Sequence, residues 1–218
     1  MNKPFEAIIF DMDGTIIDSE KLSKLSFKKV ADIYNITIDD DFIFSIIGKT
    51  MDAAKEMYIN KYGDHNYTKI FDTRRKIYNE IMTTQGLDTK GDLNLVFDTL
   101  VSKGYKLALC TSAPKLSTEK KLKIIGQENR FNVIITGDDV INGKPHPSPY
   151  LKVAELLNLD PSKCLVIEDS PNGIISANKA GMQVINIEDE ISIEQEILNL
   201  CYDKIVSLDE LNFKEYLG

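Results

Sequence analysis

Two aspartates, Asp11 and Asp13, follow an apolar run and precede a glycine in the segment Phe10-Asp11-Met12-Asp13-Gly14-Thr15. Side chains two positions apart on an extended strand point the same way, so both carboxylates can face one reaction centre. Gly14 permits the tight turn that exposes them. Two like charges so close repel each other unless a cation binds between them or one carboxyl keeps its proton. The segment therefore indicates a catalytic pair, with a divalent metal as the simpler explanation, rather than a simple turn.

Two hydroxyl residues, Thr111 and Ser112, follow the apolar run 107–110. Their hydroxyls and backbone N–H groups could hold a phosphate oxygen. An ordinary hydroxyl-capped turn before a helix explains an isolated Thr-Ser better than function does. Only its position at the end of a predicted strand makes Thr111 a candidate.

A lysine, Lys144, lies in the segment Gly143-Lys144-Pro145-His146-Pro147. Pro145 restricts the residue before it to extended geometry, so the Lys144 ammonium projects in a defined direction and could neutralise an anionic substrate. The alternative is a solvated surface lysine, which is the usual position of this residue type. We interpret His146, between two prolines, as a loop residue rather than a base or a ligand.

Two further carboxylates, Glu168 and Asp169, follow the apolar run 165–167. Neighbouring side chains on a strand point to opposite faces, so we expect one to bind the metal directly and the other to support it. We select Asp169 as the direct ligand and Glu168 as the second member of the metal site. Ser170 and Pro171 are also typical of a helix start, where acidic residues are favourable, and both explanations can hold.

Short apolar runs alternate with helical patterns along most of the chain. They predict strands at 7–10, 106–110, 132–136, 164–167, 183–187 and, more weakly, 204–206. Apolar residues at three- and four-residue intervals predict helices at 93–102, 116–125, 149–157, 172–180 and 193–200. This alternation is typical of a doubly wound α/β fold with a parallel sheet. Its strand ends carry all the residues described above.

The connection between the first two predicted strands is about ninety residues long, far beyond the usual crossover. Segments 20–34, 51–62 and 70–82 are predicted as amphipathic helices. We therefore predict a helical cap at residues 19–87, inserted into a core formed by residues 1–18 and 88–218. Because the insertion leaves from the edge that carries Asp11, it is placed to act as a lid.

Composition excludes several classes of protein. The 218 residues, 43% of them hydrophobic, can bury a full core, and a net charge of −8 argues against a nucleic-acid partner. Asp11 interrupts the first apolar run too early for a signal peptide or a membrane span, so we expect a cytoplasmic protein without a membrane partner. Cys110, Cys164 and Cys201 lack metal-ligand spacing and are interpreted as reduced core residues.

Taken in order, Asp-x-Asp-Gly-Thr, a strand-end Thr, a Lys-Pro and a Glu-Asp resemble the motifs of the haloacid dehalogenase superfamily over essentially the whole chain. The helical insertion after the first motif is similar to that of its capped phosphatase and β-phosphoglucomutase-like branch. The resemblance implies a Rossmann-like core under a helical cap. It also implies a magnesium-dependent phosphatase, a monomer or small homo-oligomer, that acts on a small phosphorylated metabolite such as a sugar phosphate.

The resemblance further implies a phosphoaspartate mechanism. Asp11 would attack phosphorus, and Asp13 would protonate the leaving oxygen and then activate water. Mg²⁺ would take the Asp11 carboxylate, the Asp13 main-chain carbonyl and Asp169 as ligands. Thr111 and Lys144 would hold the phosphoryl oxygens.

Departures from the family pattern within the cap bear on the type of reaction. Many relatives carry a His where this chain has Ser23, and mutases of this branch carry an Arg near Met51. Both differences favour a phosphatase, because a mutase needs a cap cation to clamp a second phosphate. Lys49 and Arg74, with Ser112 in the core, are candidates for substrate binding; the alternative for the two cations is solvated helix surface.

Three other functions stay open. The first is a phosphoglucomutase-like sugar mutase, which would require or accumulate a sugar bisphosphate. A dehalogenase fits less well, because the family's dehalogenases lack the second aspartate that Asp13 supplies. A non-catalytic phosphate-binding protein is a different class, and the full set of acid, base, metal and cation candidates argues against it.

Overall fold

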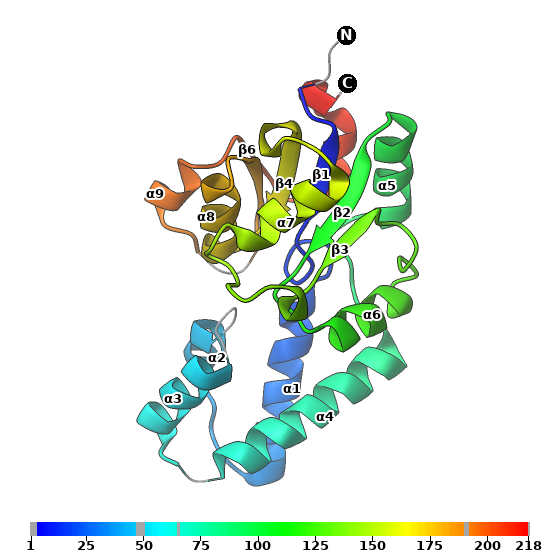
Figure 1. Cartoon of the computed structure of the whole chain (residues 1–218). Helices are drawn as coiled ribbons and strands as arrows, with labels where there is room; N and C mark the ends of the chain where they lie inside the picture. The colour runs from blue at the N-terminus through cyan, green and yellow to red at the C-terminus, as the bar shows by residue number, and fades with distance from the viewer. Residues whose placement is uncertain (1–3, 47–50, 65, 190–191, 218) are drawn as a thin grey trace. The chain divides into compact units, whose positions relative to one another are not determined.

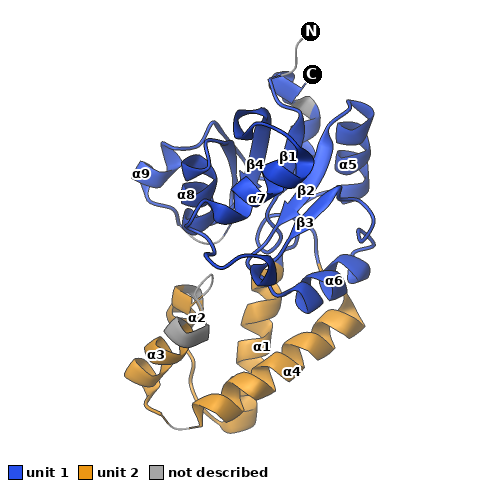
Figure 2. Cartoon of the chain, viewed as in Figure 1, with its two compact units in different colours: residues 1–18, 88–218 blue, residues 19–87 orange. Residues whose placement is uncertain are grey.

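The computed structural model describes residues 4–46, 51–64, 66–189 and 192–217. The chain forms two compact units: the core unit, Met1–Asp18 with Asp88–Gly218, and the cap unit, Ser19–Leu87 (Figure 2). No helix within the described ranges is long and apolar enough to cross a membrane.

The core unit contains a six-stranded parallel sheet in the order β3-β2-β1-β4-β5-β6 (Figure 1). This is the doubly wound arrangement predicted from the sequence. Its strands are β1 (Ala7–Phe10), β2 (Lys106–Cys110), β3 (Val133–Ile135), β4 (Cys164–Glu168), β5 (Gln183–Ile187) and β6 (Asp203–Ile205). In the register of the central strands, Phe10 of β1 lies beside Leu109 of β2 and Ile167 of β4. The residues that follow these positions therefore emerge at one edge of the sheet.

Helices cover both faces of the sheet, which is why its strands are apolar throughout. On one face, Ile9, Ala108 and Val166 pack against Tyr150 and Ile174, which belong to α7 and α8. On the other face, the Phe10 ring meets the Phe97 ring of α5 edge to face. The core helices are α5 (Leu93–Ser102), α6 (Lys115–Ile124), α7 (Ser148–Leu157), α8 (Pro171–Lys179) and α9 (Gln195–Leu198). They match the predicted helices within one residue, except that α9 is shorter than predicted.

The three cysteines are free, as expected: Cys110 and Cys164 are buried and Cys201 is partly buried.

The cap unit consists of α1 (Ser19–Tyr34), α2 (Asp40–Ile46), α3 (Met51–Tyr62) and α4 (Tyr67–Gln85). Its helices share one aromatic core, in which the Tyr58 ring contacts those of Phe42, Tyr67 and Phe71. The sequence did not predict α2, because a seven-residue segment is too short to display a helical period. Instead the Asp39 carboxylate accepts a hydrogen bond from the Phe42 N–H at 2.8 Å and begins the helix.

Candidate active site

Lys144 joins carboxylates at the ends of two different strands: Asp11 follows β1, and Glu168 is the last residue of β4. Its ammonium donates hydrogen bonds to Asp11 Oδ1 and Glu168 Oε1, both at 2.6 Å, and to the Cys110 carbonyl at 2.9 Å. Asp11 is itself fixed by its backbone N–H, which donates to the Ile167 carbonyl at 3.0 Å. The lysine side chain is only 5% exposed, so it is not the solvated surface lysine that the sequence left open.

Burial dominates the electrostatics of this cluster. It raises the pKa of Asp11 to about 7, against the opposing effect of the Lys144 ammonium. Burial alone would lower the pKa of Lys144, but the carboxylates of Asp11 and Glu168 outweigh it and hold that pKa well above its ordinary value. Lys144 is therefore a permanent cation beside a carboxyl that is costly to ionise without compensating positive charge.

Glu168 is completely buried and its carboxylate is fully engaged. Besides Lys144, its Oε1 accepts a hydrogen bond from the Tyr150 hydroxyl at 3.0 Å. Its Oε2 accepts from the N–H groups of Asp169 and Ser170 and from the Ser170 hydroxyl. A Cβ at Gly173 would overlap the Glu168 carboxylate, so only glycine fits there. Glu168 thus orients Lys144 and the start of α8.

Asp169 lies against the turn that follows β1. It is 5% exposed, and its Oδ1 accepts a hydrogen bond from the Thr15 hydroxyl at 2.7 Å. Gly14 has φ +84°, and a Cβ there would overlap the Asp169 carboxylate. Burial, together with the charges of Glu168 and Asp11, raises the pKa of Asp169 well above its ordinary value.

Asp13 has a different environment from Asp11. Its side chain is 34% exposed, and both carboxylate oxygens accept hydrogen bonds from the Lys121 ammonium, at 2.6 and 2.7 Å. The turn that carries it is held by backbone hydrogen bonds from the Gly14 N–H to the Ile17 carbonyl and from the Ile16 N–H to the Met12 carbonyl.

Thr111 and Ser112 follow β2. Thr111 is buried, and its Oγ1 accepts a hydrogen bond from the Ala113 N–H at 3.0 Å, the local turn contact that the sequence suggested as the alternative to function. Ser112 is exposed.

The cap candidate Arg74 is held by hydroxyls and rings. Its guanidinium donates to Ser23 Oγ at 2.7 Å and to Ser26 Oγ at 3.1 Å, and it lies 4.2 Å from the centre of the Phe27 ring. Burial lowers the pKa of Arg74 to about 10. Ser23 is thus a hydrogen-bond acceptor for this arginine. Lys49, the other candidate in the cap, lies outside the described residues.

The donor set fits a hard divalent cation. Asp11 and Asp169 are buried carboxylates with raised pKa values, as expected of a pair whose negative charge lacks full compensation. Among the residues described, no three His, Cys, Asp or Glu side chains group as a metal site. A cation held here would therefore complete its shell with main-chain oxygen and water, as Mg²⁺ commonly does.

Four contributors to the site were not found from the sequence: Thr15, Lys121, Tyr150 and Gly173. Thr15 is part of the motif that contains both aspartates, and Gly173 lies two residues after Pro171 at the predicted helix start, but the sequence did not indicate what either residue contacts. Tyr150 follows Lys144 by six residues and read as an ordinary apolar position of a helix. Lys121 carried no local signal at all.

Comparison with known proteins identifies the family. Residues 8–187 match the model of the haloacid dehalogenase-like hydrolases. A phosphorylated carbohydrates phosphatase of Thermotoga maritima is 33% identical over 185 residues, which cover 83% of both chains. A phosphoglycolate phosphatase of Aquifex aeolicus is 30% identical over 179 residues, which cover 80% of both chains.

Solved structures agree with the fold. A candidate β-phosphoglucomutase from Thermotoga maritima superposes with a TM-score of 0.81 at 27% identity, covering 96% of this chain and 97% of the other. The fold is thus that of a capped hydrolase of the phosphatase and β-phosphoglucomutase-like branch.

Proposed function

Because the chain belongs to the haloacid dehalogenase-like hydrolases, we propose that it is a magnesium-dependent phosphatase that hydrolyses a small phosphorylated metabolite through a phosphoaspartate. The observation that carries the proposal is the buried Lys144 ammonium, shared at 2.6 Å between Asp11 and Glu168. It provides a fixed positive charge beside a nucleophile at the strand edge where ligands of such sheets bind.

In the first half of the reaction, a carboxylate oxygen of Asp11 forms a bond to phosphorus while the bond from phosphorus to the leaving oxygen breaks. Asp13 gives its proton to that oxygen, and the product alcohol departs. In the second half, Asp13 takes a proton from water, whose oxygen attacks phosphorus and breaks the bond to Asp11. Lys144 stabilises the charge on the phosphoryl oxygens in both halves, and Thr111 is proposed to bind them as well.

Members of this family generally depend on magnesium. The residues proposed to hold the ion are Asp11, Asp169 and the main-chain carbonyl of Asp13, and the ion would neutralise charge on the phosphoryl group. Glu168 is assigned a supporting part, because both of its oxygens already accept hydrogen bonds from protein groups.

The substrate class proposed is a phosphorylated carbohydrate or a similarly small phosphorylated acid. This follows the two curated relatives, one named for phosphorylated carbohydrates and one for phosphoglycolate. Arg74 is proposed to bind an anionic or hydroxyl-rich part of the substrate, with Lys49 and Ser112 as further candidates. A β-phosphoglucomutase-like mutase is the second function, favoured by the structural similarity to the Thermotoga maritima protein.

The test is phosphate release from a panel of sugar phosphates, phosphoglycolate and other small phosphate esters, with and without Mg²⁺. Asp11→Asn should abolish release, whereas Asp98→Asn, at a 63% exposed carboxylate paired with Arg130, should not change it. Release that survives Asp11→Asn contradicts the proposal. Release that requires a sugar bisphosphate, with an isomeric sugar phosphate as product, identifies the mutase.

A further inference from the structure

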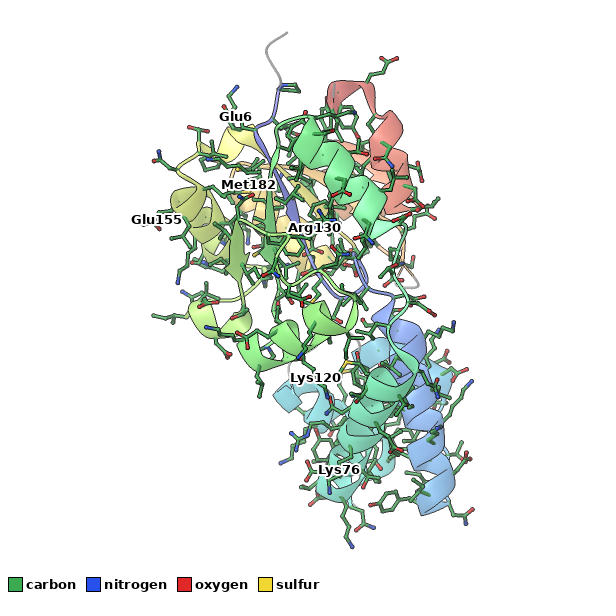
Figure 3. All side chains as sticks on the ribbon, turned by 90° about the vertical axis from the view of Figure 1, so that its right-hand side faces the viewer. Glu6, Lys76, Lys120, Arg130, Glu155 and Met182 are labelled. Carbon is green, nitrogen blue, oxygen red and sulfur yellow. The ribbon has the colours of Figure 1, made fainter. Side chains whose placement is uncertain are left out.

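Helix α6 buries a lysine. The helix turns Thr118, Lys121 and Leu122 into the core unit, positions three and four apart that share one helix face. Its other lysines include Lys120, which Figure 3 labels, and Lys123; both are exposed. Lysine is rarely buried unless it is paired, because removing an ammonium from water is costly.

The ammonium of Lys121 reaches the exposed carboxylate of Asp13. It donates to Asp13 Oδ1 at 2.6 Å and to Oδ2 at 2.7 Å. The lysine side chain is 8% exposed and that of the aspartate 34%, so the pair is closed on the side of the lysine and open to solvent on the side of the carboxylate. The two aspartates after β1 thus have separate lysine partners, Lys144 for Asp11 and Lys121 for Asp13.

We propose that Lys121 is a positioning residue for proton transfer: it fixes the orientation of the Asp13 carboxylate at the mouth of the site. The inference rests on the proposed function, in which Asp13 exchanges a proton with the leaving oxygen and with water. Both Asp13 oxygens accept hydrogen bonds from one ammonium, so the carboxylate cannot rotate freely. One oxygen has to turn from Lys121 towards the substrate to give or take the proton, and the other stays bonded and sets the axis of that turn.

The competing explanation is an ion pair that only holds α6 to the turn after β1. The two explanations differ in what they predict for substrates with different leaving groups. An alkoxide leaves only when it is protonated, so hydrolysis of a sugar phosphate needs the acid at Asp13. A 4-nitrophenolate ion leaves without a proton. A loss of proton transfer therefore affects the sugar phosphate alone, whereas a distorted site affects both substrates.

The experiment compares Lys121→Met with Lys123→Met, which removes the same charge from an exposed position of the same helix. The measured quantity is kcat/KM, which covers the reaction up to formation of the phosphoenzyme, for the best sugar phosphate and for 4-nitrophenyl phosphate. The ratio compared is kcat/KM for the sugar phosphate divided by kcat/KM for 4-nitrophenyl phosphate. In Lys121→Met this ratio should fall by about tenfold or more, because a small misplacement of a general acid slows proton transfer by that much. In Lys123→Met the ratio should stay unchanged. Asp13→Asn, which removes the proposed acid itself, is the reference variant and should lower the same ratio further.

Equal losses for both substrates in Lys121→Met would overturn the inference in favour of the structural explanation. No loss for either substrate would overturn it as well. Retention of the wild-type thermal unfolding midpoint by Lys121→Met, with the ratio lowered, would support it further. If Asp13→Asn itself leaves the ratio unchanged, the acid role of Asp13 in the proposed function is wrong, and the inference falls with it.

Discussion

The two units hold their buried cations in opposite ways. In the core unit, Lys144 is surrounded by carboxylates and bonds to two of them at 2.6 Å. In the cap unit, Arg74 is bonded to the hydroxyls of Ser23 and Ser26 and stacked on Phe27. Lys144 is buried and paired with carboxylates, whereas Arg74 is partly buried and its hydrogen bonds within the described part of the chain go to hydroxyls.

This difference corresponds to two tasks. A cation with fixed carboxylate partners is rigid and already oriented, which suits charge stabilisation that is the same for every phosphate ester. A cation held by neutral hydroxyls has lost hydration without forming an ion pair with them. An anionic ligand that binds beside it would form that ion pair. The difference agrees with the proposal that the core unit carries out the chemistry and that Arg74 of the cap unit takes part in substrate recognition.

The largest effect is expected from Lys144→Met. Removing the ammonium leaves Asp11 and Glu168 without their shared partner, so kcat should fall by about 10²–10³-fold, the range found when a single charge-stabilising donor is removed. The free energy of unfolding should fall by about 3–5 kcal/mol, as when one partner of a buried pair is removed. Steady-state kinetics and urea denaturation measure these effects, with Lys179→Met at an exposed position as the control. If Lys144→Met raised KM and left kcat unchanged, Lys144 would act in substrate binding like Arg74, and the proposed difference between the two residues would be wrong.

A second, smaller effect is expected from Gly173→Ala. Alanine normally favours a helix over glycine, but here its Cβ would overlap the Glu168 carboxylate. The displaced Glu168 would loosen Lys144, so activity should fall, and overpacking should lower the free energy of unfolding by about 1–3 kcal/mol. Asn178→Ala, on the exposed side of α8, is the control for helix propensity. Unchanged activity in Gly173→Ala would show that Lys144 does not depend on Glu168 for its orientation.

The sequence was sufficient for the parts of the core that depend on short-range pattern. The doubly wound arrangement and the strands whose ends carry Asp11 and Asp169 followed from apolar runs and strand-end motifs, whereas the order of the strands came from the structure. Contacts between segments far apart in the chain could not be predicted from the sequence. The pairing of Lys121 with Asp13 joins residues 108 positions apart, and nothing in the local pattern distinguishes this lysine from its neighbours on α6.

The cap was harder to predict for a related reason. Helix α2 begins at the Asp39 cap, and both α2 and the start of α4 pack into an aromatic core assembled from four helices rather than following a long amphipathic period. Ser23 was read as the absence of a family histidine. The structure shows that Ser23 accepts a hydrogen bond from Arg74, a contact that the sequence did not indicate.

The third effect concerns the cap cation. Arg74→Met should raise KM by about tenfold, equivalent to roughly 1.4 kcal/mol of lost binding, for substrates with a second anionic group. It should change kcat little. The thermal unfolding midpoint should not fall, because the variant removes a partly buried charge whose hydrogen bonds among the described residues go to hydroxyls rather than to a carboxylate. The matched control is Arg75→Met, since Arg75 is 68% exposed and paired with Asp72. If KM were the same in Arg74→Met and Arg75→Met, the proposal that Arg74 binds the substrate would be wrong.

The smallest expected effect concerns Asp39, a surface charge of the cap, in contrast to Lys144 and Arg74. Asp39 accepts hydrogen bonds from Lys61 and Tyr62 and from the Phe42 N–H, which hold its pKa at about 2, below its ordinary 3.8. The folded-state pKa is depressed, so its contribution to stability is present above pH 4 and is lost as the pH falls towards 2. Asp39→Asn should therefore lower the urea midpoint slightly at pH 6.

The difference between Asp39→Asn and the wild type should shrink as the pH falls from 4 towards 2, and phosphatase activity at pH 7 should be unaffected. The control is Asp72→Asn, whose carboxylate is 51% exposed and paired only three residues along its own helix, so its difference from the wild type should be smaller at every pH. A difference for Asp39→Asn that persists unchanged at the lowest pH would mean that the hydrogen-bond geometry at the start of α2, and not the charge, supplies the stability. In that case the charge of Asp39 would contribute nothing to the stability of the cap unit, and the contrast with the charge pairs of the core unit would become sharper.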